Sequence, residues 1–146
     1  MQTLFQMAEK WLNVPFRWHG KSKNGCDCIG LIIGILYENN IMANNKYKEL
    51  NKIKYGTNLL KIDYNKMLNE ILHFFKKTND INKADLLLVK YKNSPIHFIV
   101  HEKKKNNKLE KIIHVTQENG KVFKTNFDKN ISIVEKFELL KKQQND

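Results

Sequence analysis

Cys28 is the residue best placed in this sequence to act as a nucleophile. It follows Asp27 and opens an almost wholly apolar run that extends to Tyr37, which predicts a helix buried on most sides. Asp27 is a preferred N-cap residue, so Cys28 is expected in the first turn, where free N–H groups and the helix dipole favour a thiolate. The same N–H groups could bind the oxyanion of a tetrahedral intermediate. A cysteine before an apolar helix is, alternatively, a small residue of the core.

Histidines in strand-like segments could supply the base that a thiol nucleophile needs. Alternation along Ile96 to His101 places His97 and His101 on one face. His114 lies in the next apolar run, and an antiparallel neighbouring strand would bring it beside His97. With Cys28 these residues predict a Cys-His-His arrangement, in which His114 orients His97 and fixes its tautomer. Taken singly, each histidine also fits an ordinary surface or hydrogen-bonded role.

Cys26 has no evident part in this chemistry. A metal site would have to recruit Cys26, Cys28, His19 and a distant histidine, and cysteines separated by one residue are not a usual structural zinc pattern. The same spacing does not suit a stabilising disulfide. We therefore expect no metal and no other cofactor. Asp27 is expected to cap the helix and organise the loop, because a Cys-His mechanism requires no separate acid.

Helices are expected before strands, and together they must bring these side chains to one place. Apolar spacing predicts helices over residues 4–12, 28–37 and 64–75, the last with Phe75 on its apolar face. Short β-type runs follow, with a hairpin turn at Asn119-Gly120, and they cover residues 86–91, 96–100, 111–115, 122–124 and 131–137. This order predicts an α+β fold with an antiparallel sheet. The length of 146 residues, without a linker, predicts a single domain over residues 1–146.

The charge of the chain indicates which partners would attract it. Lys and Arg number 26 against 15 Asp and Glu, a formal charge of +11 that favours polyanions or simply keeps the surface soluble. A small nucleic-acid-binding protein is one alternative, but it explains neither Asp27-Cys28 nor the histidines, so we expect no specific nucleic acid as a partner. The N-terminus lacks a secretory signal, and no apolar run approaches the roughly 20 residues of a membrane helix. We therefore expect synthesis in the cytoplasm and no transmembrane segment.

The motif around Cys28 extends well beyond the cysteine itself. The segment from Gly25 to Leu31 reads GCDCIGL, and it is preceded by Trp11-Leu12 and by Pro15 to Trp18. These residues resemble the signature of the NlpC family of papain-like cell-wall cysteine peptidases. Ala84 to Leu88 also resembles the Gly-Asp-Leu strand opener of that family. The similarity covers roughly residues 5 to 125 and is specific around Asp27-Cys28.

The resemblance implies a fold, a triad and a substrate. The fold is the papain-like NlpC fold, with the catalytic cysteine at the start of a buried central helix packed on an antiparallel sheet. Cys28 would be the nucleophile, His97 the base, and His114 the residue that completes the triad. The substrates would be amide bonds in peptidoglycan stem peptides, often cut after D-glutamate, and their carboxylates would suit the basic surface.

Several residues depart from the usual family pattern. Phe16 stands where the family generally has a tyrosine whose hydroxyl lies near the active site. Trp18-His19-Gly20 replaces Trp-Gly-Gly, and Cys28-Ile29-Gly30 replaces Cys-Ser-Gly. With the extra Cys26, these changes resemble the branch encoded by phages and phage-like elements, whose members are associated with tails. The stretch from Lys103 to Lys108 is expected to lengthen the connection between the two histidine strands.

The motif also suggests which residues meet the substrate and where the protein works. Phe16, Trp18 and Asp27, next to Cys28 in the motif, are expected to bind substrate. Possible partners are phage-like tail proteins, and the protein would act at the cell wall after tail assembly or lysis. The alternative is a structural or assembly protein of such a tail that retains the fold with little activity, which the absence of a hydroxyl at Phe16 favours.

Overall fold

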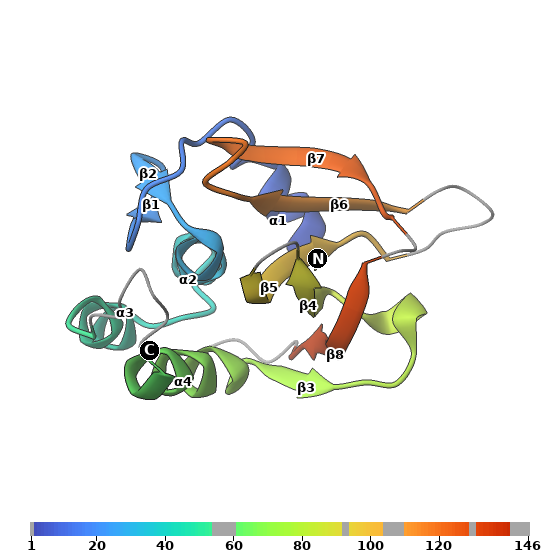
Figure 1. Cartoon of the computed structure of the whole chain (residues 1–146). Helices are drawn as coiled ribbons and strands as arrows, with labels where there is room; N and C mark the ends of the chain where they lie inside the picture. Colours follow the sequence, from blue (N-terminus) through green and yellow to red (C-terminus); the bar gives the residue numbers. More distant parts are fainter. Residues whose placement is uncertain (1, 54–60, 92–93, 104–109, 129–130, 141–146) are drawn as a thin grey trace.

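The computed structural model describes residues 2–53, 61–91, 94–103, 110–128 and 131–140 as helices packed against antiparallel strands (Figure 1). The helices are α1 (Leu4–Glu9), α2 (Cys28–Glu38), α3 (Asn44–Asn51) and α4 (Lys61–Leu72), with a 3-10 turn η1 (Ile81–Lys83). The strands are β1 (Lys21–Ser22), β2 (Gly25–Cys26), β3 (Phe75–Lys77), β4 (Leu86–Tyr91), β5 (Ser94–His101), β6 (Lys111–Val115), β7 (Val122–Asn126) and β8 (Ser132–Leu139). The predicted α+β class with an antiparallel sheet is confirmed.

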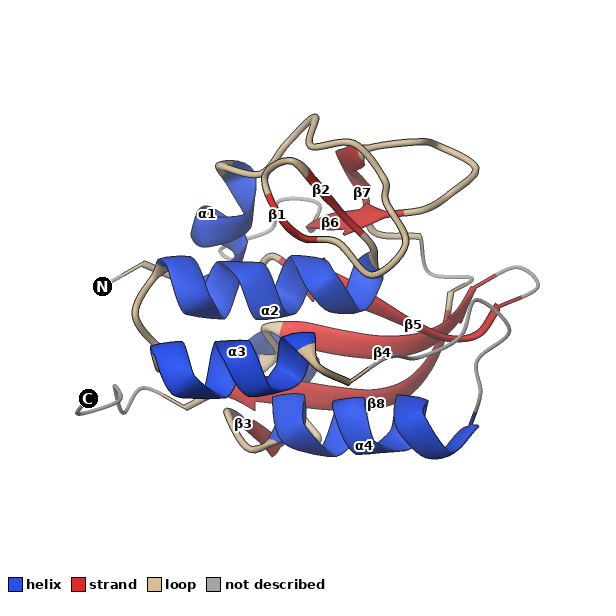
Figure 2. Ribbon diagram, turned by 90° about the vertical axis from the view of Figure 1, so that its left-hand side faces the viewer, coloured by secondary structure: helices blue, strands red, loops and turns tan. Residues whose placement is uncertain are grey.

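The large sheet curves around the central helix α2 (Figure 1). Its six strands run in the order β3-β8-β4-β5-β6-β7, and every pairing is antiparallel. Helices α2, α3 and α4 lie on one side of β4, β5 and β8 (Figure 2). The two-stranded ribbon of β1 and β2 lies across α2 from the large sheet. In the described part of the chain, no helix has the length and apolar character that a membrane span requires.

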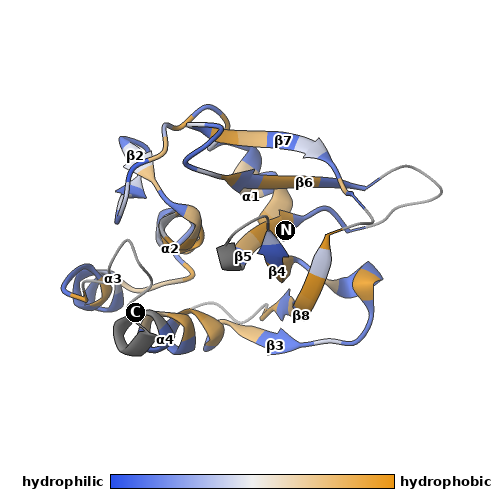
Figure 3. Cartoon of the chain, viewed as in Figure 1, coloured by the Kyte–Doolittle hydropathy of each residue, from blue (hydrophilic) through white to orange (hydrophobic). Residues whose placement is uncertain are grey.

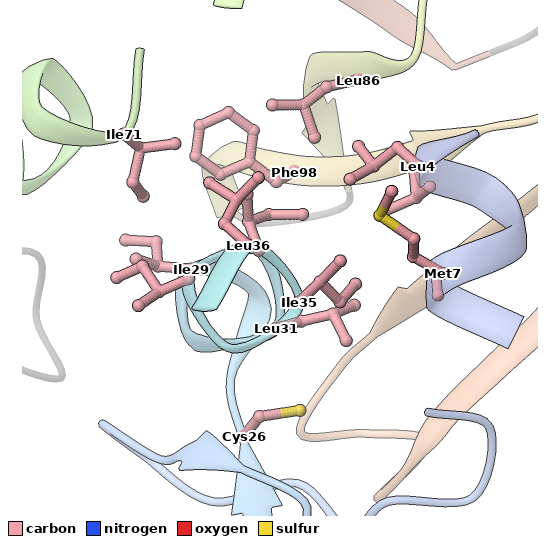
Figure 4. Packing of buried hydrophobic residues seen from close by; sticks show 14 of the residues in the cluster. Leu4, Met7, Cys26, Ile29, Leu31, Ile35, Leu36, Ile71, Leu86 and Phe98 are labelled. Carbon is pink, nitrogen blue, oxygen red and sulfur yellow. The ribbon is translucent and has the colours of Figure 1, made fainter. Parts of the chain in front are cut away.

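Helix α2 is the centre of the main core, as the apolar run predicted. All residues from Ile29 to Leu36 are buried, and Leu86 and Phe98 of the sheet pack in the same cluster (Figure 4). Hydrophobic residues predominate in α2 and recur along the sheet strands (Figure 3), and Leu88 and Val100 belong to the same core cluster as α2. Full burial of one Leu or Ile side chain contributes roughly 1.5–3 kcal/mol. This core fixes the position of the helix start and therefore of Cys28.

Two glycines allow the loop before α2 to lie directly on the helix. A Cβ atom at Gly34 would lie 2.7 Å from the carbonyl oxygen of Lys21 and would overlap the Trp11 ring. A Cβ atom at Gly30 would overlap the carbonyl oxygen of Gly20. The main chain can therefore approach α2 only because these positions carry no side chain. The sequence pattern did not predict this contact.

Two helices end earlier than predicted. Helix α1 ends at Glu9 rather than at residue 12, and the chain turns through Asn13, whose φ is 75°. Helix α4 ends at Leu72, and Phe75 begins β3, where it pairs with Leu139 of β8. Phe75 is buried, and one buried apolar residue fits the pattern of a helix as well as that of a strand, so the pattern could not decide between them.

The strand predictions are largely confirmed. All five predicted strands are present with bounds shifted by a few residues, and the turn at Asn119-Gly120 joins β6 to β7. Gly120 has a φ of 86°, and its N–H donates to the carbonyl oxygen of Thr116 at 2.9 Å. Strands β1, β2 and β3 and helix α3 were not predicted. Most of the predicted basic loop, residues 104–108, lies outside the described residues.

Candidate active site

His97 and His114 form a buried pair on neighbouring strands. His97 lies on β5 and His114 on β6, and Nε2 of His97 is 2.8 Å from Nδ1 of His114. Their side chains are only 5% and 1% exposed. The predicted proximity of these histidines is therefore confirmed. Antiparallel pairing of β5 with β6 brings together residues that are 17 positions apart in the sequence.

His101 has a separate set of contacts. Its Nδ1 lies 2.7 Å from the carbonyl oxygen of Ala84, and its Nε2 lies 2.9 Å from a carboxylate oxygen of Glu110. Its ring also meets Phe127 edge-on, with 5.6 Å between the ring centroids. Both ring nitrogens of His101 are thus engaged away from His97. His97 and His101 were predicted on the same face of the strand, but their imidazoles have different partners.

Cys28 is the first residue of α2, and its thiol reaches the strand that carries His97. The main-chain N–H groups of Phe98, the residue after His97, and of Ile29 and Cys28 lie near enough to the thiol to lower its pKa. Strands β5 and β6 pair at Val100–Ile113 and His101–Ile112, which lie beyond Phe98 along β5. The Phe98 N–H lies near the thiol, so the start of α2 lies close to β5.

The pKa of Cys28 is opposite in direction to the expectation from a helix N-terminus. Burial, and then the negative charge of Asp27, raise the pKa of the Cys28 thiol to about 12, although the hydrogen bonds from the three main-chain N–H groups oppose this shift. The predicted low-pKa thiolate is therefore wrong. Loss of water around the sulfur outweighs the helix N-terminus. At neutral pH the thiol keeps its proton.

The pKa of His97 is displaced in the direction that favours a neutral imidazole. Burial, and then the neighbouring His114, lower the pKa of His97 to about 3. A neutral imidazole carries one proton. If the Nε2–H of His97 donates to Nδ1 of His114, then Nδ1 of His97 keeps a lone pair that can accept a proton. That tautomer is the one that a base at Nδ1 requires.

Asp27 organises the loop and the helix start, as predicted. One carboxylate oxygen accepts the N–H of Gly30 at 2.7 Å, which caps α2, and the other accepts the N–H of His19 at 2.9 Å. The side chain is only 2% exposed. Both oxygens are held by the main chain and turned away from solvent, whereas its part in substrate binding stays a prediction. Lys21 lies nearby, and its Nζ donates to the carbonyl oxygen of His19 at 3.0 Å.

Phe16 and Trp18 lie on the loop that leads to Cys28. Phe16 is partly buried against the main core and meets Trp18 edge-on, with 5.1 Å between the ring centroids. Trp18 is 37% exposed, so its ring is open to a ligand. Phe16 also bridges to Cys26, and the N–H of Arg17 donates to the carbonyl oxygen of Cys26 at 3.0 Å. These contacts hold both rings on the loop that Asp27 anchors to α2.

Tyr91 is a residue of the site that the sequence pattern did not single out. It ends β4, and its ring stacks on His97 at 5.1 Å and meets His114 edge-on at 5.2 Å. Phe123 on β7 contacts His114 from another side, at 4.4 Å between centroids. A hairpin between the predicted strands 86–91 and 96–100 was the available signal. It would have placed Tyr91 near His97 had its register been known.

Cys26 is close to the site in sequence but is enclosed by the core. It is 0% exposed, and both Cys26 and Cys28 are free thiols. Cys26 belongs to the main core cluster, and Figure 4 shows it on the segment that leads into α2. Among the described residues, His, Cys, Asp and Glu side chains do not gather in groups of three or more that could hold a metal ion.

Comparison with known proteins gives one structural similarity. No protein-family model matches the chain, and no curated protein matches it. The fold is similar to the crystal structure of the NlpC/p60 domain of the peptidoglycan hydrolase SagA, with a TM-score of 0.48 and 16% sequence identity over 90% of this chain and 96% of that chain. The roles considered for Cys28, His97 and His114 rest on their own contacts and not on this similarity.

Proposed function

We propose that this protein is a cysteine hydrolase that cleaves amide bonds in peptidoglycan stem peptides. The observation that carries the proposal is the buried His97–His114 pair, whose ring nitrogens are 2.8 Å apart. The main-chain N–H of Phe98, the residue after His97, lies near the Cys28 thiol. A thiol, a base and a residue that orients the base are the parts of a nucleophilic triad. Cys28, His97 and His114 take these roles in the proposal.

The first half of the reaction transfers the acyl group to Cys28. Because the pKa of Cys28 is raised to about 12, the thiol is protonated until substrate is attacked, and Nδ1 of His97 takes this proton as the sulfur bonds to the amide carbon. The carbonyl oxygen becomes an oxyanion near the main-chain N–H groups at the start of α2. His97 then gives the proton to the leaving amine, the C–N bond breaks, and a thioester remains.

The second half of the reaction releases the product. Nδ1 of His97, neutral again, removes a proton from a water molecule as the water oxygen attacks the thioester carbon. The second tetrahedral intermediate then breaks its C–S bond, and His97 returns the proton to the sulfur of Cys28. In both halves His114 accepts the Nε2–H of His97, which supports the positive charge that the imidazole carries between transfers.

The substrate class is proposed from the residues around Cys28. The GCDCIGL segment and the aromatic residues before it resemble the signature of the NlpC family. Members of that family cut stem peptides, often after D-glutamate. Trp18 is 37% exposed on the loop before Cys28 and offers an apolar surface to the peptide, and its ring packs edge-on against Phe16. The formal charge of +11 would attract the carboxylates of stem peptides. We propose a D-glutamyl endopeptidase.

Digestion of purified peptidoglycan tests the hydrolase. Wild-type protein, Cys28→Ala and the matched control Cys26→Ala are incubated with walls of several types, and released fragments are identified by mass spectrometry. We expect stem-peptide fragments from wild type and from Cys26→Ala, and none from Cys28→Ala. The fragment ends identify the bond, and termini other than D-glutamate would refute the D-glutamyl assignment. Equal release by wild type and Cys28→Ala would refute the hydrolase.

A structural protein of a phage-like tail with little activity is the second candidate. Two observations favour it: Phe16 has no hydroxyl, and burial keeps the Cys28 thiol protonated, with a pKa of about 12. Under this proposal purified walls stay intact, while wild type and Cys28→Ala both copurify with tail particles. An absence of the protein from such particles would exclude this candidate.

Phage association and the place of action form a separate proposal. The replacements at His19 and Ile29, with the extra Cys26, resemble the phage-associated branch of the family. We propose that the protein acts at the cell wall after tail assembly or lysis. Immunoblots of tail particles, cytoplasm and culture medium before and after lysis test this. Protein that remains in the cytoplasm after lysis and is absent from particles would contradict it.

A further inference from the structure

The ring of Tyr91 contacts both imidazoles of the proposed triad. We propose that Tyr91 is a positioning residue that holds the His97 ring in the orientation needed for catalysis. This inference rests on the proposed hydrolase function and adds a residue to its machinery. Under this proposal Tyr91 acts through His97 and does not contact the reacting atoms.

The contacts of Tyr91 enclose the histidine pair. Its ring lies nearly parallel to that of His97, with an interplanar angle of 30° and 5.1 Å between centroids. The same ring is nearly perpendicular to that of His114, with an angle of 84° and a centroid distance of 5.2 Å. Phe123 contacts His114 at 4.4 Å, so aromatic rings from β4 and β7 flank the pair. These arrangements are among those that aromatic pairs prefer.

The hydrogen bond to His114 does not by itself fix the plane of the His97 ring. The bond restrains one atom, Nε2, while the torsion that turns an imidazole about its Cβ–Cγ bond has broad minima. A stacked ring restrains that rotation, because turning the imidazole would break the parallel contact with Tyr91. The direction of the Nδ1 lone pair, which the proposed mechanism requires to point at the Cys28 thiol, therefore depends on both contacts. Geometry within a few tenths of an ångström is what a proton transfer between fixed groups requires.

Tyr91 also controls how much water and charge reach His97. Tyr91 itself is partly exposed, whereas His97 is 5% exposed and His114 is 1% exposed, so the tyrosine ring covers the pair. The titratable groups that contact His97 are His114 from β6 and Tyr91 from β4. The face of the tyrosine ring attracts the positive imidazolium that forms when His97 accepts the proton. Removal of the ring would admit water to His97.

The test compares three variants by steady-state kinetics on a stem peptide. Tyr91→Phe keeps the ring, Tyr91→Leu removes it, and Tyr37→Leu removes a stacked tyrosine at the other end of α2 as the matched control. We expect Tyr91→Phe and Tyr37→Leu to stay within about threefold of wild type. Tyr91→Leu should lower kcat about tenfold, with KM within about threefold, because the ring acts on proton transfer and not on binding.

The pH profile supplies a measurement that a purely structural role would not move. Burial lowers the pKa of His97 to about 3, so exposure in Tyr91→Leu raises this pKa toward its ordinary value of about 6.5. The acid limb of kcat/KM should therefore move to higher pH in Tyr91→Leu and stay in place in Tyr37→Leu. An unchanged kcat and acid limb in Tyr91→Leu would overturn the proposal. A loss in Tyr91→Phe as large as in Tyr91→Leu would also overturn it, since the hydroxyl would then be responsible.

Nitrogen NMR of the histidine rings separates this proposal from the proposed function. Protein labelled with ¹⁵N is compared as wild type, Tyr91→Phe and Tyr91→Leu, without substrate. One fixed tautomer of His97 in the first two and averaging between tautomers in Tyr91→Leu would support positioning, even if wild type released no fragments from any wall. Identical tautomer signals in all three proteins would refute positioning, even if the hydrolase were active.

Discussion

Replacing Asp27 with asparagine should make the protein less stable and Cys28 more reactive. Asp27 holds two main-chain N–H groups, that of Gly30 at 2.7 Å and that of His19 at 2.9 Å, and its charge also raises the pKa of Cys28. Asparagine keeps one acceptor oxygen, but its NH₂ group must face the other N–H group. Both effects would speed alkylation of Cys28, but only opening of the structure would also expose Cys26, so the two can be separated.

The size of each effect follows from the contacts. Loss of one charge-assisted bond at a buried site, with an N–H left unpaired, costs about 2 kcal/mol. For a chain of 146 residues this lowers the melting temperature by roughly 7 °C. Removal of the carboxylate lowers the pKa of Cys28 from about 12, and a decrease of one pKa unit makes alkylation about tenfold faster at any pH below the pKa. Burial remains, so the pKa stays above its ordinary range.

The assay follows alkylation of both cysteines by iodoacetamide at pH 7 to 9, read by mass spectrometry of peptides, beside thermal melts. Cys26 is 0% exposed and stays unlabelled unless the structure opens, so it reports opening in the same sample. Thr3→Ala is the matched control, because it removes the N-cap of α1, a bond of 3.1 Å from the N–H of Gln6, without a change of charge. It should lower the melting temperature and leave Cys28 reactivity unchanged.

Three results would contradict this reasoning. If Cys28 of Asp27→Asn reacts at the wild-type rate or more slowly, then the carboxylate does not raise the thiol pKa. If Cys26 and Cys28 accelerate together, then opening of the loop and not charge explains the change. A melting temperature equal to that of wild type would show that the two main-chain bonds of Asp27 contribute little to stability.

Three further predictions follow from the same geometry. His114→Ala leaves the Nε2–H of His97 buried without its acceptor at 2.8 Å, and it should lower kcat by about 100-fold with little change in KM, measured on a stem peptide; equal activity would contradict the triad. The pKa of His97 is lowered to about 3, so its contribution to stability is present above about pH 6.5 and is lost as pH falls toward 3. Urea denaturation should therefore give at most about 2 kcal/mol less stability at pH 5 than at pH 7.5, and His97→Gln should abolish this part of the difference. Gly34→Ala places a Cβ atom 2.7 Å from the Lys21 carbonyl oxygen and against Trp11, and it should destabilise the protein by about 2 kcal/mol in the same assay; an unchanged midpoint would show that the loop moves freely.

The long apolar patterns predicted the main elements because they are dictated by burial along one segment. The run after Asp27 became α2, and the β-type runs became β4 to β8. Helix α3 escaped prediction because only Leu50 of its residues is buried, which leaves no apolar face to recognise. Strands β1 and β2 have two residues each and exist through their partners, so no period marks them.

The residue types of the candidate site could be predicted from the sequence, but their relative positions, burial and pKa values could not. The Asp27-Cys28 helix start and the two histidine strands follow from local preferences for caps and for alternation. Their meeting point depends on strand register, which brings His97 within 2.8 Å of His114 and aligns Tyr91 with the pair.

The sequence by itself thus determined which side chains are available for chemistry and which elements carry them. Only the tertiary structure decided the direction of the pKa values, because desolvation depends on every segment packed around a group. A helix N-terminus predicts a low pKa for Cys28, but burial and Asp27 raise it to about 12. The burial of Asp27, which is 2% exposed, also came from the tertiary structure, although its role as a cap was predicted from the sequence. Local sequence specifies helix ends and strand faces, whereas the loss of water at a site is set by residues far apart in the chain.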